Sequence, residues 1–195
     1  MRKKQYRFFG GLLTMQERWL NKMAHGGYRL VRTGKLLYEF ETCRAGEFVY
    51  CVDFIGHMAG AGAEEYCGFL EDAGCRVFYK NINLNYSLGK IRFRPWAERG
   101  GKIAADFTTF NRELLIVEKK NDGKPFQLHT TYEDRAGYCR ILQKPYLFTL
   151  LLFSAAGILM RAWLWGVFAV PFLIPVILYQ AEAIRMRKLA KTEEW

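Results

Sequence analysis

The chain has 195 residues, of which 51% are apolar and 25% charged, and its 29 Lys and Arg against 19 Asp and Glu give a net charge of +10. This composition excludes a disordered chain, and the length allows one ordinary domain or a small domain with an appendage. Five irregularly spaced cysteines, with no signal peptide at the start, argue against a disulfide-stabilised secreted scaffold.

The positive charge is concentrated at the start of the chain. Residues 1–35 hold nine basic residues and one acid, whereas residues 36–90 hold eight acids and four basic residues. Proteins that bind nucleic acid usually gather Lys and Arg along one face. We therefore expect no nucleic-acid partner, and we interpret the basic residues at positions 2–7 as a solvated arm or a contact to anionic lipid.

Residues 1–87 are predicted to form one module of alternating strands and helices. Thr14 and Glu17 have the spacing of a capping box, which would begin the first helix. A second helix is predicted over 63–73. Stretches rich in apolar, aromatic and β-branched residues predict strands over 5–10, 28–32, 36–42, 47–55 and 76–80.

An internal repeat with a period of 47 residues relates the two predicted helices. Residues 17–30 align with 64–77 through a Glu, an aromatic residue, a helix-terminating Gly and an Arg followed by an aliphatic residue. The alternative is chance similarity between two amphipathic helices. Two strand–helix–strand copies predict an α+β fold, a ferredoxin-like split βαβ sandwich in which residues 36–42 add an extra strand.

Residues 88–144 are predicted to form a β-hairpin extension followed by a juxtamembrane helix. Strands over 113–120 and 125–129 would flank the turn sequence Asn-Asp-Gly-Lys at 121–124. A second capping box, from Thr130 to Glu133, would open a helix over 132–143.

The segment from Pro145 to Ala181 contains one charged residue, Arg161. It predicts two transmembrane helices over 145–160 and 163–180, about 24 and 27 Å long against a hydrocarbon core of about 30 Å. Residues 182–195 would then be a basic cytoplasmic tail. The alternative is one span over 163–181, with 145–160 lying in the membrane interface.

The charges that flank these spans predict their orientation. Seven basic residues lie within twenty residues of the outer ends of the two spans, against Arg161 alone between them. Lys and Arg near span ends favour the cytoplasmic side. We therefore expect a plasma-membrane protein with two spans and with both termini in the cytoplasm.

Several motifs over residues 3–140 resemble those of one bacterial family, catalogued as domain of unknown function 2812. The motifs are Tyr6-Arg-Phe-Phe9, Trp19-Leu-Asn-Lys-Met-Ala24, Gly27-Tyr-Arg-Leu30, Tyr38-Glu-Phe-Glu41, Val52-Asp-Phe54 and Phe69-Leu-Glu71. Cys75 stands where many members carry Trp. The resemblance implies C-terminal hydrophobic helices, genes that neighbour PadR-type transcriptional regulators, and a regulatory context with no established activity.

Chemical motifs are weak in this sequence. The histidines at 25, 57 and 129 share no metal-ligand spacing, and Gly56–Gly62 lacks the order of a phosphate-binding loop. Asp53, in an apolar strand, is the acid of most interest, and we expect it to pair with Arg7 or Arg29 rather than to act on a substrate. We predict no catalytic, cofactor-binding or metal-binding residue and no cofactor.

The function that these features favour is a membrane-tethered, non-catalytic sensory, regulatory or adaptor protein. Its cytosolic module would bind a ligand or a protein, and its partners would be the lipid bilayer and either another protein or further copies of this chain. The alternatives are an accessory subunit of a membrane transporter and, third, an enzyme that acts at the membrane surface.

Overall fold

The computed structural model divides the chain into two compact units, residues 1–94 with 103–129 and residues 95–102 with 130–195. It describes residues 2–55, 58, 60–82, 86–88, 91–93, 103–104, 113–124, 126, 128 and 131–193.

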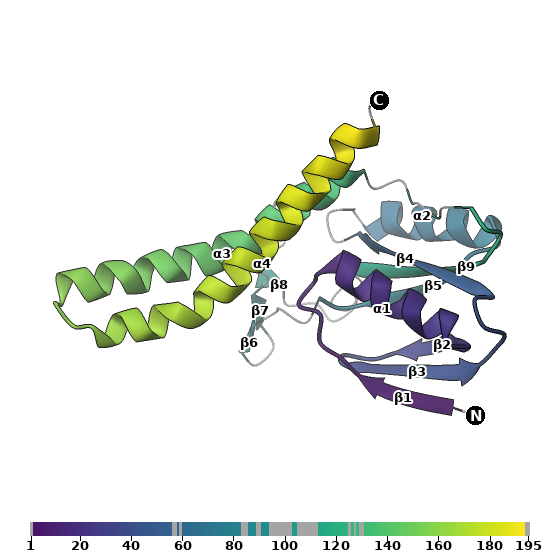
Figure 1. Ribbon diagram of the computed structural model, residues 1–195, viewed down its shortest axis with the longest axis horizontal. Helices are drawn as coiled ribbons and strands as arrows, with labels where there is room; N and C mark the ends of the chain where they lie inside the picture. Colours follow the sequence, from purple (N-terminus) through teal and green to yellow (C-terminus); the bar gives the residue numbers. More distant parts are fainter. Residues whose placement is uncertain are drawn as a thin grey trace. The chain divides into compact units, whose positions relative to one another are not determined.

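The first repeat of the first unit consists of β1 (Arg2–Tyr6), α1 (Leu13–His25), β2 (Tyr28–Thr33) and β3 (Leu37–Thr42). The last strand lies in the middle, because β3 pairs antiparallel with both β1 and β2 (Figure 1). The strand predicted over 36–42 is therefore the centre of a three-stranded sheet rather than an addition to one.

Helix α1 packs on its own sheet through aromatic side chains. The ring of Trp19 lies 5.0 Å from that of Tyr38 and 5.5 Å from that of Phe40, both on β3. Leu20 and Ala24, one and five residues further along the helix, are buried. Period-two alternation on β3 places Tyr38 and Phe40 on the same covered face of the sheet.

The second repeat consists of β4 (Phe48–Phe54), α2 (Gly60–Asp72), β5 (Arg76–Lys80) and β9 (Leu114–Lys120). Again the last strand lies in the middle, since β9 pairs antiparallel with β4 and β5. The sequence assigned this strand to an extension over 88–144. Its first four residues are apolar and buried, as befits a strand covered on both faces.

The two repeats have the same topology. Both bounds of α2 lie 47 residues after those of α1, and each repeat reads strand–helix–strand–strand with its last strand in the centre. The predicted period is confirmed. A ferredoxin-like topology is not confirmed, because each described sheet is completed by a strand of its own repeat rather than by one from the other repeat.

The long connection between β5 and β9 contains three short strands, β6 (Tyr86–Leu88), β7 (Ile91–Phe93) and β8 (Ile103–Ala104), which pair antiparallel in that order. After β9 the predicted turn is present, with Gly123 at φ 77° and its amide donating to Asn121 Oδ1 at 3.0 Å. The hairpin strand predicted over 125–129 falls largely outside the described residues.

The second unit contains two long helices, α3 (Tyr132–Leu159) and α4 (Leu164–Glu193). A capping box opens α3, but it joins Thr131 to Asp134, one residue later than predicted. Helix α3 continues through Pro145, so the predicted juxtamembrane helix and first span are one helix. The chain reverses over residues 160–163.

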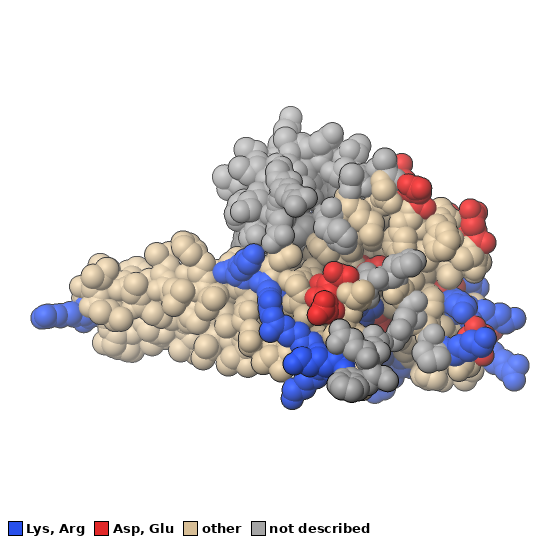
Figure 2. All heavy atoms as spheres, turned by 90° about the horizontal axis from the view of Figure 1, so that it is seen from above, with Lys and Arg blue, Asp and Glu red and all other residues tan. Residues whose placement is uncertain are grey.

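Both helices of the second unit are long and apolar enough to cross a membrane. They pack against each other through aromatic residues, with the ring of Phe153 on α3 lying 5.9 Å from that of Trp165 and 5.6 Å from that of Phe172 on α4. The outer surface of the pair is also apolar, since seventeen large apolar side chains between Leu147 and Ile184 are exposed. Figure 2 shows this stretch as an almost uncharged surface.

Candidate functional site

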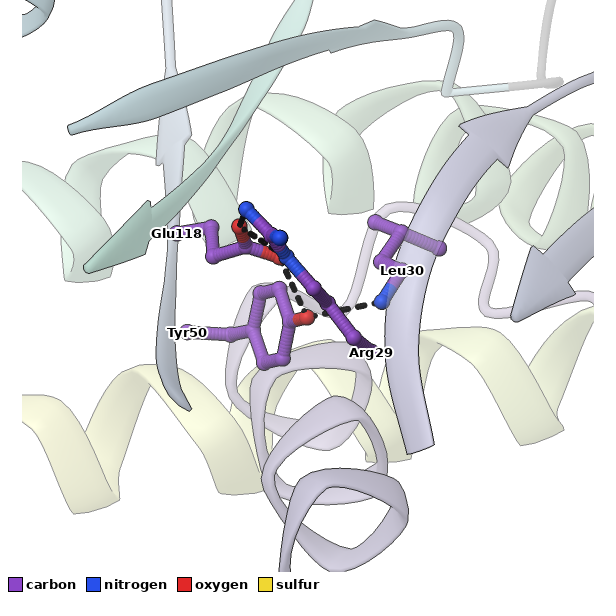
Figure 3. A network of polar contacts seen from close by, with 4 residues as sticks. All are labelled: Arg29, Leu30, Tyr50 and Glu118. Carbon is purple, nitrogen blue, oxygen red and sulfur yellow. Dashed lines mark hydrogen bonds and ion pairs between the residues drawn. The ribbon is translucent and has the colours of Figure 1, made fainter. Parts of the chain in front are cut away.

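The candidate site is a set of polar groups that joins the two repeats of the first unit. It consists of Arg29 and the backbone amide of Leu30 on β2, Tyr50 on β4 and Glu118 on β9, and is called here the inter-repeat network (Figure 3). Tyr50 and Glu118 are directly opposite in the β4–β9 register, so both side chains lie on the same face of that sheet.

Three donors from the two sheets form the hydrogen bonds of this network. The Tyr50 hydroxyl donates to Glu118 Oε2 at 2.6 Å and accepts from the amide of Leu30 at 2.8 Å. Arg29 donates through Nε at 2.9 Å to Glu118 Oε1 and places Nη2 2.8 Å from the same oxygen. Tyr50 and Glu118 are 1% and 2% exposed, whereas the Arg29 side chain is 30% exposed, so the carboxylate is buried and the guanidinium reaches the surface.

Burial and charge fix the protonation states of the network. Burial, followed by the hydrogen bond to Glu118, raises the pKa of Tyr50 above its ordinary value, so the phenol stays a neutral donor. The hydrogen bond to Glu118 raises the pKa of Arg29, which stays cationic and lies 4.2 Å from the ring centroid of Phe48. The network is therefore a set of charge-assisted hydrogen bonds that joins the repeats around a buried carboxylate.

A second connection joins α1 of the first repeat to β4 of the second. Asn21 forms two hydrogen bonds with the backbone of Tyr50, each 2.8 Å long, and Glu17 Oε2 accepts from the amide of Val52 at 3.2 Å. Glu17 and Asn21 are four residues apart and so share a helix face. They occupy the outer edge of β4 in place of a neighbouring strand.

This use of Glu17 differs from the prediction. No side chain caps α1, which begins at Leu13, and Thr14 lies within the helix rather than at its N-cap. The spacing of a capping box was present in the sequence, but the Glu17 carboxylate binds the edge of β4 instead. A carboxylate can satisfy a helix terminus or a strand edge equally well, and sequence spacing does not distinguish the two.

Lys80 connects the ends of β5 and β2. Its ammonium group donates to the carbonyl oxygens of Gly34 and Lys35 in the turn after β2, and it lies 4.4 Å from the ring centroid of Tyr38. Nearby, Thr33 Oγ1 donates to the Tyr79 carbonyl at 2.9 Å. Lys80 is 4% exposed, and its burial lowers the pKa of the amine to about 8.

Asp53, the acid that the sequence singled out, is buried between β4 and α2. Its Oδ2 accepts from the Tyr66 hydroxyl at 3.1 Å, and its Oδ1 accepts from the amide of Phe54 at 2.8 Å. The expected pairing with Arg29 is not what the structure shows, because Arg29 contacts Glu118 on β9. The guanidinium of Arg7 lies 5.5 Å from the ring centroid of Trp19.

The other candidate residues do not gather into a chemical site among the described residues. His57 and His129 lie outside the described residues, as do Gly56 and Ala59 of the glycine-containing loop. All five cysteines are free thiols. Within the described part of the chain, no group of three or more His, Cys, Asp or Glu side chains could hold a metal ion.

The sequence carried one usable signal for the inter-repeat network. Glu118 follows the apolar run Leu-Leu-Ile-Val at 114–117, and an acid at the end of a buried strand needs a partner. That partner could not be identified, because Arg29 lies 89 positions earlier and the strand was assigned to a different part of the chain.

The chain was compared with protein-family models, curated proteins and solved structures. The family model described as "Protein of unknown function (DUF2812)" matches residues 13–151. No curated protein and no solved structure matches the chain.

Proposed function

Since the chain belongs to the DUF2812 family, described as a protein of unknown function, we propose its function from its geometry. We propose a membrane-tethered, non-catalytic protein with a sensory, regulatory or adaptor role. In this proposal α3 and α4 anchor the chain in the bilayer, and the first unit binds a ligand or a protein partner.

The observation that carries the tether is the apolar outer surface of the helical pair. A core helix of a soluble protein turns its apolar stripe inward and a polar face outward. Here seventeen large apolar side chains between Leu147 and Ile184 are exposed, and Arg161 is the one charged residue between Pro145 and Ala181. An outer surface of this kind is stable in hydrocarbon and unstable in water.

The contacts of the buried charged groups in the first unit support a non-catalytic role. Glu118 binds Arg29 and Tyr50, Asp53 binds Tyr66, and Lys80 binds backbone carbonyls. These groups connect strands and repeats, so their chemistry contributes to the fold. A binding role would then fall to the exposed surface of the unit.

The proposed orientation places both termini on the cytoplasmic side of the plasma membrane. It rests on the excess of Lys and Arg beyond the outer ends of the two spans, with Arg161 alone in the turn between them. In intact cells, a membrane-impermeant thiol reagent should label an introduced Cys at Arg161 but not one at Arg140 or Thr192. Labelling at Thr192 without Arg140 would mean one span and would contradict the hairpin.

The tether itself is tested by alkaline extraction of membranes that contain the full chain. The wild-type chain should stay in the membrane fraction, and a variant with Leu151→Lys and Ile174→Lys should be released, since both positions are exposed on the apolar surface. A matched control is Glu133→Lys, at the start of α3. Release of the wild-type chain would contradict the tether.

A further inference from the structure

The exposed apolar side chains of the first unit are not scattered. Five large apolar side chains are exposed in its described part, and three of them, Tyr6, Phe8 and Leu36, come from two segments that a backbone hydrogen bond joins. The other two, Met15 on α1 and Phe69 on α2, lie on helices. Single exposed apolar residues are normal on a protein surface, whereas a cluster marks an interaction site.

Backbone contacts bring these segments together. The amide of Arg7, which follows β1, donates to the carbonyl of Leu36 at 2.9 Å, and Tyr6 pairs with Leu37 in the β1–β3 register. The chain then turns into α1 over residues 9–12, where Phe9 is 7% exposed and packs 5.4 Å from the ring of Trp19. Phe8, one residue earlier, is 58% exposed.

Two contacts hold the same region in place. Lys80 donates to the carbonyls of Gly34 and Lys35, which fixes the turn that presents Leu36. The guanidinium of Arg7 lies 5.5 Å from the ring centroid of Trp19. The exposed apolar side chains therefore project from an ordered backbone.

Basic side chains surround this apolar group. Arg7 and Lys35 are exposed beside it, and Lys4 on β1 has a side chain that is 63% exposed. Glu39 lies 3.9 Å from Lys4, and its side chain is only 13% exposed. We call Tyr6, Arg7, Phe8, Lys35 and Leu36 the β1 corner.

We propose that the β1 corner docks on the anionic headgroups of the membrane in which the chain is tethered. Peripheral membrane contacts combine apolar side chains that enter the acyl boundary with Lys and Arg that attract acidic lipids. The aliphatic member of the corner, Leu36, favours lipid over nucleic acid, because surfaces that bind nucleic acid use aromatic stacking and cations. The inference rests on the proposed tether and adds a second contact that sets the orientation of the first unit.

The test measures the distance of the corner from lipid in the full chain. The chain is reconstituted in phosphatidylcholine vesicles with or without phosphatidylserine, both carrying nitroxide quenchers on headgroups. A fluorophore is attached at Leu36→Cys, with Cys43 and Cys75 changed to serine, since these are the two partly exposed native cysteines. The matched control is the same label at Phe69→Cys on α2.

We expect strong quenching at Leu36→Cys in phosphatidylserine vesicles, and weak quenching there in phosphatidylcholine alone and at Phe69→Cys in both. Each basic residue near an anionic surface strengthens binding about fivefold, so a variant with Arg7→Glu and Lys35→Glu should weaken docking at least 25-fold. High salt should have a similar effect. Equal quenching at the two labels, or no dependence on lipid charge, would overturn the proposal.

Two further outcomes separate this proposal from its alternatives. If a single-stranded oligonucleotide binds the full chain and the Arg7→Glu, Lys35→Glu variant loses it, the corner binds nucleic acid instead and the lipid assignment is wrong. If the chain stays in the vesicles through alkaline extraction but the label at Leu36→Cys is not quenched, the docking proposal is wrong and the tether stands. Loss of the chain from the vesicles contradicts the tether.

Discussion

The two repeats of the first unit share a topology but use their helices differently. Helix α1 covers its own sheet with Trp19 and also binds the edge of β4 with Glu17 and Asn21. The residue of α2 equivalent to Asn21 is Gly68, which has no side chain with which to bind a strand edge. Within a repeated fold, one helix can thus take on a joining role that its copy lacks.

The loops of the repeats differ as well. Three residues separate β2 from β3, whereas 33 residues separate β5 from β9. The first repeat is therefore local in sequence, and the second depends on a distant strand. Five predictions test the contacts within and between the repeats.

The largest effect is expected at the helix–sheet contact of the first repeat. Trp19→Ala should destabilise the first unit by about 3–5 kcal/mol, because it removes the ring that packs on Tyr38 and Phe40. At the equivalent position, Tyr66→Phe keeps the ring and loses only the bond to Asp53, so its cost should be smaller. Urea unfolding monitored through amide exchange of β3 and β9 measures both. Equal losses of unfolding free energy in the two variants would contradict this prediction.

The inter-repeat network should come next. Glu118→Ala leaves Arg29 and Tyr50 without their buried acceptor and should cost about 3 kcal/mol. Exchange protection should fall in both sheets, because the network spans them. The control is Asp122→Ala, which removes an exposed ion pair with Lys119 and should have little effect. Loss of protection in β9 alone would show that the network does not join the repeats.

The hydrogen bonds from α1 to the edge of β4 should contribute less to stability than the inter-repeat network. Asn21→Ala leaves the amide and carbonyl of Tyr50 unpaired, at a cost of about 1–3 kcal/mol. Asn21→Asp retains an acceptor for the amide and should recover part of the loss. Faster amide exchange at Tyr50, without a change in β1, is the expected signature. An unchanged Tyr50 amide would mean that the contact contributes nothing.

Lys80 should make stability depend on pH. Its pKa is about 8 in the folded unit and about 10.5 when unfolded, so between these values the unfolded chain binds more protons and stability rises with pH. We expect a gain of about 1–2 kcal/mol from pH 7.5 to 9.5. Lys80→Met should abolish the gain. If the free energy of unfolding falls from pH 7.5 to 9.5 in the wild type but not in Lys80→Met, the lowered pKa of Lys80 is contradicted.

The smallest effect has the opposite sign. Gly68→Ala should stabilise α2 by about 0.5–1 kcal/mol, because a Cβ at this position meets no atom within 4 Å and alanine favours the helix. Destabilisation by Gly68→Ala would show that a side chain at this position makes an unfavourable contact, and it would contradict the prediction.

Much of the architecture could be predicted from the sequence because its signals are local. Helical periodicity located α1 and α2, the 47-residue period related them, and the uncharged run after Pro145 located two helices of membrane length. The central position of β9 was not predictable in this way. Its residues were recognised as a strand, but strand pairing across 33 intervening residues leaves no mark in local patterning.

The site was less accessible to sequence reasoning for the same reason. Glu118, Arg29 and Tyr50 come from three strands, and their convergence follows from the sheet order rather than from spacing. Glu17 was recognised as important but given the wrong contact. Asp53 was expected to pair with Arg7 or Arg29, but it accepts hydrogen bonds from the Tyr66 hydroxyl and the Phe54 amide.

The late position of β9 bears on how the chain is made. All strands of the first sheet lie within the first 42 residues, so that sheet can form early in synthesis. The second sheet must wait for its central strand, which ends only eleven residues before α3 begins. We therefore expect the ribosome to deliver the strand that completes the module and the hydrophobic helices almost together. Until β9 is synthesised, β4 and β5 lack their shared partner strand. We expect the chain to be most prone to misfolding, and most dependent on chaperones, during this interval.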